Sequence, residues 1–286
     1  MKTAVMTDTN SGISIEEGKE LGVFVLPMPV IVDGKDYLEH ISITHEELYK
    51  AIIDKKDVCT SQPSPDDLIS MWKKILAEGY DDIVHIPMSS GLSSSCEMAK
   101  SFAREFDGRV QVADSHRISV TLRDSVMEAK KLADEGMNAE QIREHLDKTG
   151  YESSIYIAVN TLDLLKKSGR VTAAAAAIAS VFHIKPILTI QGGKLDAFTK
   201  ARGIRQCESK ILDAITEDIK NRFSDVDPQR IWVGAAGTFA KKEDADNWLA
   251  VTRERFPQYN TYYNDLSCSI ACHVSVDAIG MGVTYR

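Results

Sequence analysis

The stretch DIVHIPMSSGLSSSCEMAKSFAREF (residues 82–106) decides the predicted fold class. It begins with a short apolar run at residues 82–87, continues as a serine-rich loop and ends in an amphipathic run at residues 96–106. The apolar run predicts a buried strand, and the amphipathic run predicts a helix. Strand, loop and helix in this order form the first half of a βαβ unit, from which parallel sheets are built.

The same alternation extends through the first 150 residues on both sides of this stretch. It predicts an α/β domain with a parallel sheet over residues 1–150. In such sheets ligands bind beyond the carboxyl ends of the strands, where the serine-rich loop lies. Strands are expected at residues 3–6, 23–32, 82–87 and 110–113, and helices at residues 45–55, 66–77, 96–106, 118–134 and 139–148.

Residues 151–286 have a different pattern. Residues 186–190 and 194–200, joined by Gln191-Gly192-Gly193, predict a β-hairpin. A second α/β domain with a mixed or antiparallel sheet is therefore expected, and two domains suit a chain of 286 residues. Further strands are expected at residues 155–159 and 231–235, and helices at residues 172–181, 206–222 and 245–256, before a glycine-containing end.

Composition narrows the class of partner. The chain has 42 acidic and 34 basic side chains and a net charge of -8, which disfavours binding to nucleic acid. Its five cysteines lack the paired spacing of a secreted disulfide framework. No run of about 18 apolar residues is present, so stable membrane insertion is not expected. The segment MKTAVMTDTN lacks an apolar export signal, and we expect a cytoplasmic protein.

The serine-rich loop allows a catalytic interpretation. Gly91-Leu92-Ser93-Ser94-Ser95 is one residue short of the G-x-S-x-G nucleophile elbow, and it has the strand-turn-helix context of that motif. An α/β serine hydrolase acting on lipid esters would use Ser93, Asp227 and His273 in that chain order. Against it, Ser95 replaces the final glycine, and serines before a helix commonly serve as N-caps. The hydrolase remains an alternative at this point.

The loop also allows a binding interpretation. Hydroxyls and free backbone N–H groups at a helix N-terminus suit an anion, because the helix dipole favours negative charge there. The segment Thr60-Ser61-Gln62-Pro63-Ser64 repeats this chemistry before another predicted helix. Two such loops could converge on one carboxylate or phosphate.

Other polar landmarks carry weaker signals. Asp8 and Asp114 follow predicted strands and could orient loop hydroxyls, although turn-forming aspartates are common. Cys268, Cys272 and His273 have a spacing that is a poor zinc signature, so no metal and no cofactor are predicted. From the residues alone, Arg170 and Arg202 are ordinary surface charges.

Taken in chain order, the motifs resemble the DegV family of bacterial fatty-acid-binding proteins, whose members serve fatty acid kinase systems. The resemblance covers essentially the whole chain. The matching segments are Met6-Thr7-Asp8-Thr9, Thr60-Ser61-Gln62-Pro63-Ser64, Ser89-Ser90-Gly91-Leu92-Ser93, Asp114-Ser115, Leu165-Lys166-Lys167-Ser168-Gly169-Arg170, Ile184-Lys185-Pro186-Ile187-Leu188, Gly193-Lys194 with Lys200-Ala201-Arg202, and His273.

The resemblance implies a lipid-binding protein without enzymatic activity of its own. Its two α/β domains would bury a long-chain fatty acid in a tunnel, and Thr60 and Ser93 would hydrogen-bond the carboxylate. Arg170, Arg202 and His273 would support presentation of that carboxylate to a separate ATP-dependent fatty acid kinase. The resulting acyl phosphate would enter phospholipid metabolism.

The sequence departs from the family pattern after His273. Family members usually have glycines shortly after this histidine, whereas residues 274–277 here are Val-Ser-Val-Asp. Side chains at these positions are expected to reposition His273 or to narrow the pocket. Ser94-Ser95-Cys96 also differ from the family pattern, and the first two are expected to be helix caps.

Overall fold

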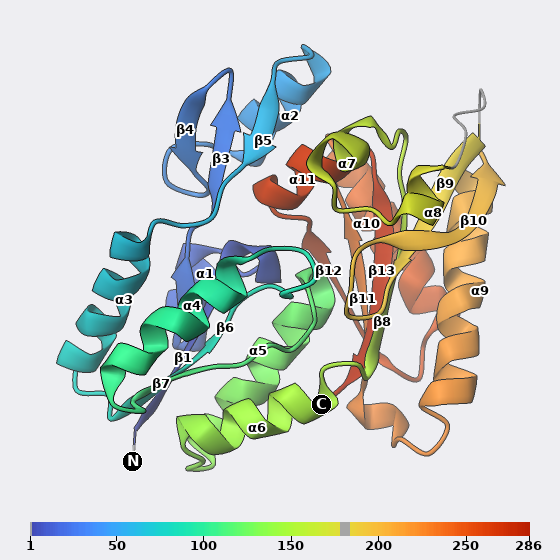
Figure 1. Cartoon of the computed structure of the whole chain (residues 1–286). Helices are drawn as coiled ribbons and strands as arrows, with labels where there is room; N and C mark the ends of the chain where they lie inside the picture. Colours follow the sequence, from blue (N-terminus) through green and yellow to red (C-terminus); the bar gives the residue numbers. More distant parts are fainter. Residues whose placement is uncertain (1, 178–183) are drawn as a thin grey trace.

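The computed structural model describes residues 2–177 and 184–286, which form three β-sheets with helices around them (Figure 1). A four-stranded sheet has the order β2-β1-β6-β7, and a six-stranded sheet has the order β10-β9-β8-β13-β11-β12. A smaller sheet has the order β4-β3-β5. This architecture confirms the predicted fold class, an α/β protein with a parallel sheet followed by a mixed sheet. The domain boundary near residue 150 stays a prediction.

The four-stranded sheet is parallel throughout and has helices on both faces. Alternate side chains of one strand face opposite sides, so Val5 packs with helices α5 and α6 while Ala4 and Met6 pack with α3 and α4. Because both faces are covered, the strands are mostly buried and rich in apolar residues, which made them visible in the sequence. The elements are β1 (Thr3–Asp8), α1 (Ile15–Leu21), β2 (Val23–Leu26), α3 (Pro65–Ala77), β6 (Asp82–Ile86), α4 (Ser95–Ala103), β7 (Val110–Val112), α5 (Ser119–Asp134) and α6 (Ala139–Thr149).

The six-stranded sheet is mixed, with β11 and β12 parallel and the other pairs antiparallel. Helices α9 and α10 pack on one face. The opposite face turns toward α5, α7, α8 and α11, and this face lines the cavity described below. The elements are β8 (Ser153–Ala158), α7 (Asp163–Ser168), α8 (Ala173–Ala176), β9 (Ile184–Ile190), β10 (Asp196–Arg202), α9 (Ile204–Arg222), β11 (Ile231–Gly237), α10 (Lys242–Arg255), β12 (Asn260–Asp265), α11 (Cys268–Val274) and β13 (Ile279–Tyr285).

The small sheet was not expected from the sequence. Residues 23–32 were predicted as one strand, which is wrong: they form β2 and β3 (Pro29–Val32) in two different sheets. Pro27 and Pro29 lack the N–H that a continuous ladder needs, so the chain leaves the first sheet there. β3 pairs with β4 (Lys35–Leu38) and β5 (Val58–Thr60). With α2 (His45–Ile53), this sheet packs against α11.

The C-terminal half contains two further differences from the prediction. The helix expected at residues 172–181 is described only as α8, Ala173–Ala176, and residues 178–183 lie outside the described part of the chain. The glycine-containing end resolves into α11 and β13, and β12 was missed because its polar residues mask the alternation typical of a strand.

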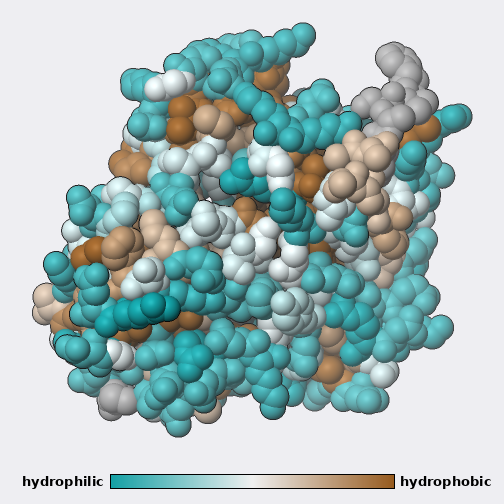
Figure 2. All heavy atoms as spheres, in the orientation of Figure 1, coloured by the Kyte–Doolittle hydropathy of each residue, from teal (hydrophilic) through white to brown (hydrophobic). Residues whose placement is uncertain are grey.

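The viewed surface of the protein (Figure 2) is mostly hydrophilic, with apolar side chains in a few places. Figure 2 shows apolar side chains between the small sheet and the six-stranded sheet, while most of the remaining viewed surface is hydrophilic. Among the described residues, none of the helices has the length and the apolar character that crossing a bilayer requires.

Candidate functional site

A cavity of about 360 Å³ lies between the carboxyl ends of the parallel strands and one face of the six-stranded sheet. Its volume falls within the range of small-molecule binding sites. One end is polar and the remainder is apolar. The apolar part is lined mainly by Leu92, Ile118, Val120, Ile155, Ile157, Leu165, Ile190, Leu195, Ala236, Leu266, Ile270 and Val274.

Small residues on β11 and β13 make room for the cavity. Ala236 pairs with Gly280, which pairs with Ile157 on the next strand, so these three positions form one row across the sheet. A Cβ placed on Gly280 would meet no atom closer than 3.4 Å, because the cavity lies above it. In the neighbouring row, Gly234 and Gly282 have no such space, since side chains of α5 pack directly against them. The row with Gly234 and Gly282 lets α5 pack closely on the sheet, and the row with Gly280 leaves space for the cavity.

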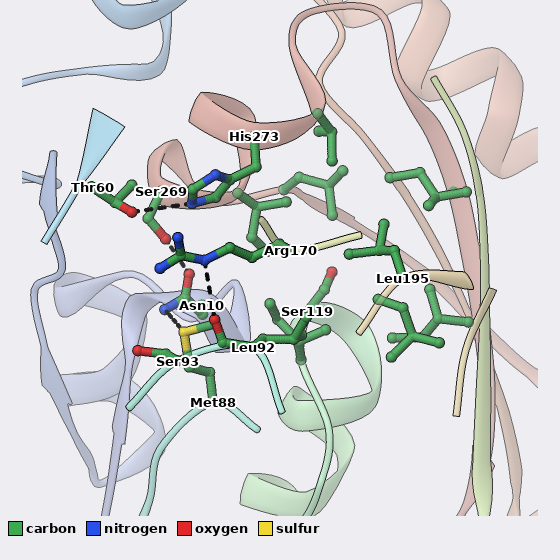
Figure 3. Close-up of a pocket in the computed structure, with 18 of the residues that line it drawn as sticks. Asn10, Thr60, Met88, Leu92, Ser93, Ser119, Arg170, Leu195, Ser269 and His273 are labelled. Atoms are coloured by element: carbon green, nitrogen blue, oxygen red, sulfur yellow. Dashed lines mark hydrogen bonds between the residues drawn. The ribbon is translucent and has the colours of Figure 1, made fainter. Parts of the chain in front are cut away.

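Four predicted site residues come together at the polar end. Thr60, Ser93, Arg170 and His273 all line the cavity. The hydroxyl Oγ1 of Thr60 lies 3.1 Å from Nε2 of His273 (Figure 3). Thr60 is the last residue of β5, and His273 lies on α11, so packing between the small sheet and α11 creates this pair.

The two hydroxyl-rich loops meet, as the sequence suggested they could. Nε2 of Gln62, from the Thr60 loop, donates a 2.7 Å hydrogen bond to Oγ of Ser94, from the serine-rich loop. Residues of both loops line the same end of the cavity. Their convergence gives the cavity a polar end made of hydroxyls.

Arg170 lies across this polar end. Figure 3 shows its guanidinium group between the Thr60–His273 pair and the loop that carries Leu92 and Ser93. Nε donates to the carbonyl oxygen of Leu92 at 3.4 Å, and Nη1 donates to the carbonyl oxygen of Ser168. Within the described part of the chain Nη2 has no hydrogen-bond partner, which leaves donors for an anion.

Arg202 is not brought into this group. It is exposed on β10, and its backbone N–H donates to the side chain of Gln206. It is absent from the lining of the cavity. Any role of Arg202 would therefore have to operate from the outer surface.

The loop serines are used differently from the expected caps. Oγ of Ser93 accepts a hydrogen bond from the backbone N–H of Ser95 at 3.2 Å. Ser94 occupies the N-cap position of α4 but makes no capping hydrogen bond through its side chain, because that hydroxyl accepts from Gln62 instead. Oγ of Ser95 is buried without a partner in the described structure. Ser94 is therefore the predicted cap residue by position although its side chain makes no capping bond, whereas the prediction for Ser95 is wrong because Ser95 is the first residue of α4.

The triad of the hydrolase alternative is not assembled. His273 pairs with Thr60, and among the described residues no hydrogen bond joins it to Ser93. Asp227 is exposed and caps the short 3-10 helix Pro228–Arg230 through the backbone N–H of Gln229. A serine nucleophile needs a base within hydrogen-bond reach, and this site does not supply one to Ser93.

Buried aspartates hold the loop backbone. Asp8 accepts from the backbone N–H groups of Met88 at 2.9 Å and Asn10 at 2.8 Å. Asp114 accepts from the N–H of Ser90 at 3.3 Å. Burial raises the pKa of Asp8 to about 6, although its hydrogen bonds oppose the shift. These carboxylates orient amides rather than the hydroxyls expected from the sequence.

Sequence reasoning missed the polar residues Asn10, Ser119 and Ser269, which line the cavity. Asn10 is fully buried, and its Oδ1 accepts hydrogen bonds from Oγ of Ser267 and of Ser269. Asn10 and Ser269 both line the cavity. They come from opposite ends of the chain, and no local motif marks either of them.

His273 is neutral at physiological pH. Burial, with a smaller contribution from the positive charge of Arg170, lowers its pKa to about 4. An unfolded histidine titrates near 6.5, so the unfolded chain binds the proton first. We therefore expect this residue to reduce stability as the pH falls from about 6.5 to about 4, and its full contribution to be present above about 6.5. NMR titration of the ring should report the low pKa, and an ordinary value would contradict the described burial.

After His273, two residues adopt backbone conformations that glycine adopts most easily, although neither residue is a glycine. Ser275 has φ 68° and ψ −174°, a conformation that glycine adopts without strain, and Asp277 also has a positive φ. Thr238 holds this turn: its Oγ1 donates to the carbonyl oxygen of Ser275 at 2.8 Å, and its own carbonyl oxygen accepts from the N–H of Asp277. His273 and Val274 both line the cavity, and the expected effect of residues 274–277 on the position of His273 or the width of the pocket stays a prediction.

Ser275→Gly is expected to stabilise the protein by about 1 kcal/mol, because it removes the steric cost of this backbone conformation. Equilibrium denaturation in urea measures the change. Ser224→Gly, at an exposed position without a positive φ, serves as the control and should be neutral or slightly destabilising. Equal effects of the two substitutions would show that Ser275 is unstrained.

The parallel sheet with hydroxyl loops at its strand ends, facing an apolar cavity on a second sheet, defines an α/β ligand-binding protein. The model of the uncharacterised DegV family matches residues 2–286, so the chain belongs to the DegV family. This agrees with the resemblance noted in the sequence.

Individual relatives agree with this assignment. A DegV domain-containing protein of Deinococcus radiodurans is 30% identical over 78% of each chain, and one of Listeria monocytogenes is 27% identical over 98% of this chain and 97% of its own. A solved structure that describes fatty acid binding of a DegV family protein from Thermus thermophilus superposes over 100% of both chains, with TM-score 0.87 and 27% identity. DegV from Bacillus subtilis, a fatty acid binding protein, superposes over 100% of both chains with TM-score 0.85; at 22% identity this shows the shared fold alone.

Proposed function

We propose that this protein binds a long-chain fatty acid, with the acyl tail in the apolar cavity and the carboxylate at Thr60 and Ser93. The observation that carries the proposal is a cavity whose apolar walls end at Thr60, Ser93, Arg170 and His273. The fatty acid binding described for the Thermus thermophilus relative supports the same ligand class.

The energetics favour an amphipathic ligand. Each buried methylene contributes about 0.8 kcal/mol, so a tail of about fifteen methylenes gains on the order of 10 kcal/mol before ordering costs. Hydroxyl donors then fix the carboxylate without an ion pair with lysine. The tail supplies most of the affinity, and the polar end sets the orientation.

The second part of the proposal concerns a partner. The carboxylate is presented to a separate ATP-dependent fatty acid kinase, which forms an acyl phosphate. Nη2 of Arg170, which has no partner among residues 2–177 and 184–286, supports this role, because a guanidinium group can stabilise charge that develops during phosphoryl transfer. The exposed Arg202 is assigned to the surface that faces the kinase. The binding protein positions the substrate, and the kinase performs the chemistry.

Mass spectrometry tests the ligand and the hydrolase alternative together. The protein purified from cells should carry a lipid under native conditions and release an intact fatty acid when denatured. Incubation with a fluorophosphonate should leave the protein unlabelled. Stoichiometric labelling that is lost in Ser93→Ala would sink the binding function and support the hydrolase.

Thr60→Val and Ser93→Ala are each expected to weaken fatty acid binding about tenfold or more, since a hydrogen bond to a charged group contributes about 1.5–3 kcal/mol. A fluorescent fatty acid displacement assay measures the dissociation constant. Ser70→Ala, at an exposed serine on α3, is the matched control. Because Ser93 also accepts from the N–H of Ser95, thermal unfolding must confirm that the variant is folded.

A further inference from the structure

A second group of polar side chains lies outside the cavity, between the small sheet and α11. Glu39, His45 and Cys268 place a carboxylate oxygen, an imidazole nitrogen and a thiol sulfur within 4.8 Å of one another. Glu39 is 1% exposed and Cys268 is fully buried, whereas the side chain of His45 is 28% exposed. The group is therefore buried on one side and open to solvent on the other.

A second histidine extends this group. Nε2 of His45 lies 3.7 Å from Oε1 of Glu39, and Nε2 of His40 lies 3.9 Å from the same oxygen. In a tetrahedral zinc site, nitrogen and oxygen ligands at about 2.0–2.2 Å from the metal lie roughly 3.4 Å from each other. Small side-chain movements would therefore bring these donors to one ion.

The hydrogen bonds of Glu39 leave it able to bind a cation. Oε2 accepts from Oγ1 of Thr9 at 2.7 Å, and Oε1 accepts from the backbone N–H of Cys268 at 2.6 Å. Each carboxylate oxygen has a further lone pair that can bind a metal ion. In metal sites, hydrogen bonds from surrounding groups to a ligating carboxylate hold it in the correct orientation. His45 would exchange a 3.1 Å contact with the carbonyl oxygen of Leu266 for the metal.

The hydroxyl of Tyr49, beside this group, supports the binding of an ion here. The ring of Tyr49 packs against His45 at 5.8 Å between centroids, and its OH is buried without a partner among the described residues. Buried hydroxyls normally have a partner, so this one is open to a group that the described residues do not supply. A water or hydroxide on a metal ion would satisfy it.

We propose that Glu39, His45 and Cys268 form a binding site for a zinc-class divalent ion, with a water or hydroxide as the fourth ligand and His40 beside it. Thiolate and imidazole donors favour such ions over magnesium or calcium. Binding replaces the proton of the Cys268 thiol by the metal, and the proton is released to solvent. The two negative ligands then neutralise the charge of the ion.

The position of the site gives it a structural consequence. Glu39, His40 and His45 belong to the unit formed by the small sheet and α2, whose strand β5 carries Thr60. Cys268 begins α11, which carries His273. A bound ion would fasten together the two elements that form the Thr60–His273 pair. Metal and lipid sites would thus be coupled through α11.

Cobalt(II) binding to the chelator-treated protein tests the proposal. One ion per chain should bind and produce a thiolate-to-cobalt charge-transfer absorption, and zinc(II) should displace it. Cys268→Ser should abolish the band and weaken zinc binding at least tenfold, and His45→Gln should weaken it similarly. Cys272→Ser is the matched control, because Cys272 is also buried on α11 but lies outside the group; it should retain both signals.

Two results would overturn the site: no thiolate band with cobalt(II), or a band that persists in Cys268→Ser. Equal loss in Cys272→Ser would place the ion elsewhere and would overturn it as well. Thermal unfolding of each metal-free variant shows whether it is folded. Lipid retention is measured separately on the metal-free wild-type protein, so the fatty acid function and the metal site can fail independently.

Discussion

Gly280→Ile is expected to weaken binding of a long-chain fatty acid about 200-fold. The substitution adds four carbons to a position where a Cβ has no neighbour closer than 3.4 Å, so the new side chain enters the cavity. It displaces about four methylenes of the tail, which corresponds to about 3 kcal/mol. A β-branched residue also suits the strand conformation of β13, and the fold should tolerate it.

The effect should depend on chain length. A fatty acid that is shorter by about four methylenes should bind the variant and the wild-type protein with similar affinity, because its tail no longer reaches the filled space. Ala250→Ile, at an exposed position on α10, is the control and should bind both ligands normally. Unchanged affinity of the long fatty acid for a folded Gly280→Ile protein would show that the tail does not occupy this cavity.

Arg170→Ala is expected to reduce acyl phosphate formation by a fatty acid kinase about 10²–10³-fold, the effect of removing one preorganised charge donor from a transition state. Retention of the fatty acid should change by less than about threefold, because Arg170 is proposed to act during transfer. The measurement combines lipid mass spectrometry of the purified variant with a reconstituted kinase reaction. Together, the two measurements distinguish an effect of Arg170 on fatty acid binding from an effect on phosphoryl transfer.

The control for this experiment is Lys166→Ala, which removes an exposed positive charge from the neighbouring helix α7. It should leave both readings unchanged. If Arg170→Ala lost the fatty acid as completely as Ser93→Ala, the proposed division of labour would be wrong, and Arg170 would be a ligand for the carboxylate in the ground state.

Much of the parallel half of the fold was accessible from the sequence. Strands β1 and β6 are buried and rich in apolar residues because helices cover both faces of the sheet, and this pattern is visible in a single sequence. The small sheet was not accessible. Pro27 and Pro29 interrupt an apolar run without showing whether the next strand joins the same sheet or a different one.

The candidate site divides in the same way. Hydroxyl loops before helices are local signals, so Thr60 and Ser93 could be selected, and the family resemblance added Arg170, Arg202 and His273. Only the structure separates Arg202, on an outer strand, from the residues that line the cavity. Asn10 and Ser269 could not be found, since their contact joins segments 259 residues apart.

The sequence by itself determined the strands of the parallel sheet, the long amphipathic helices and the hydroxyl loops, because periodicity, proline placement and capping chemistry act over a few residues. Tertiary structure alone decided where the cavity lies and what faces it. The hollow above Gly280, the pairing of Thr60 with His273 and the grouping of Glu39, His45 and Cys268 each require elements distant in sequence. Such contacts depend on how sheets and helices pack, and no local pattern encodes that packing.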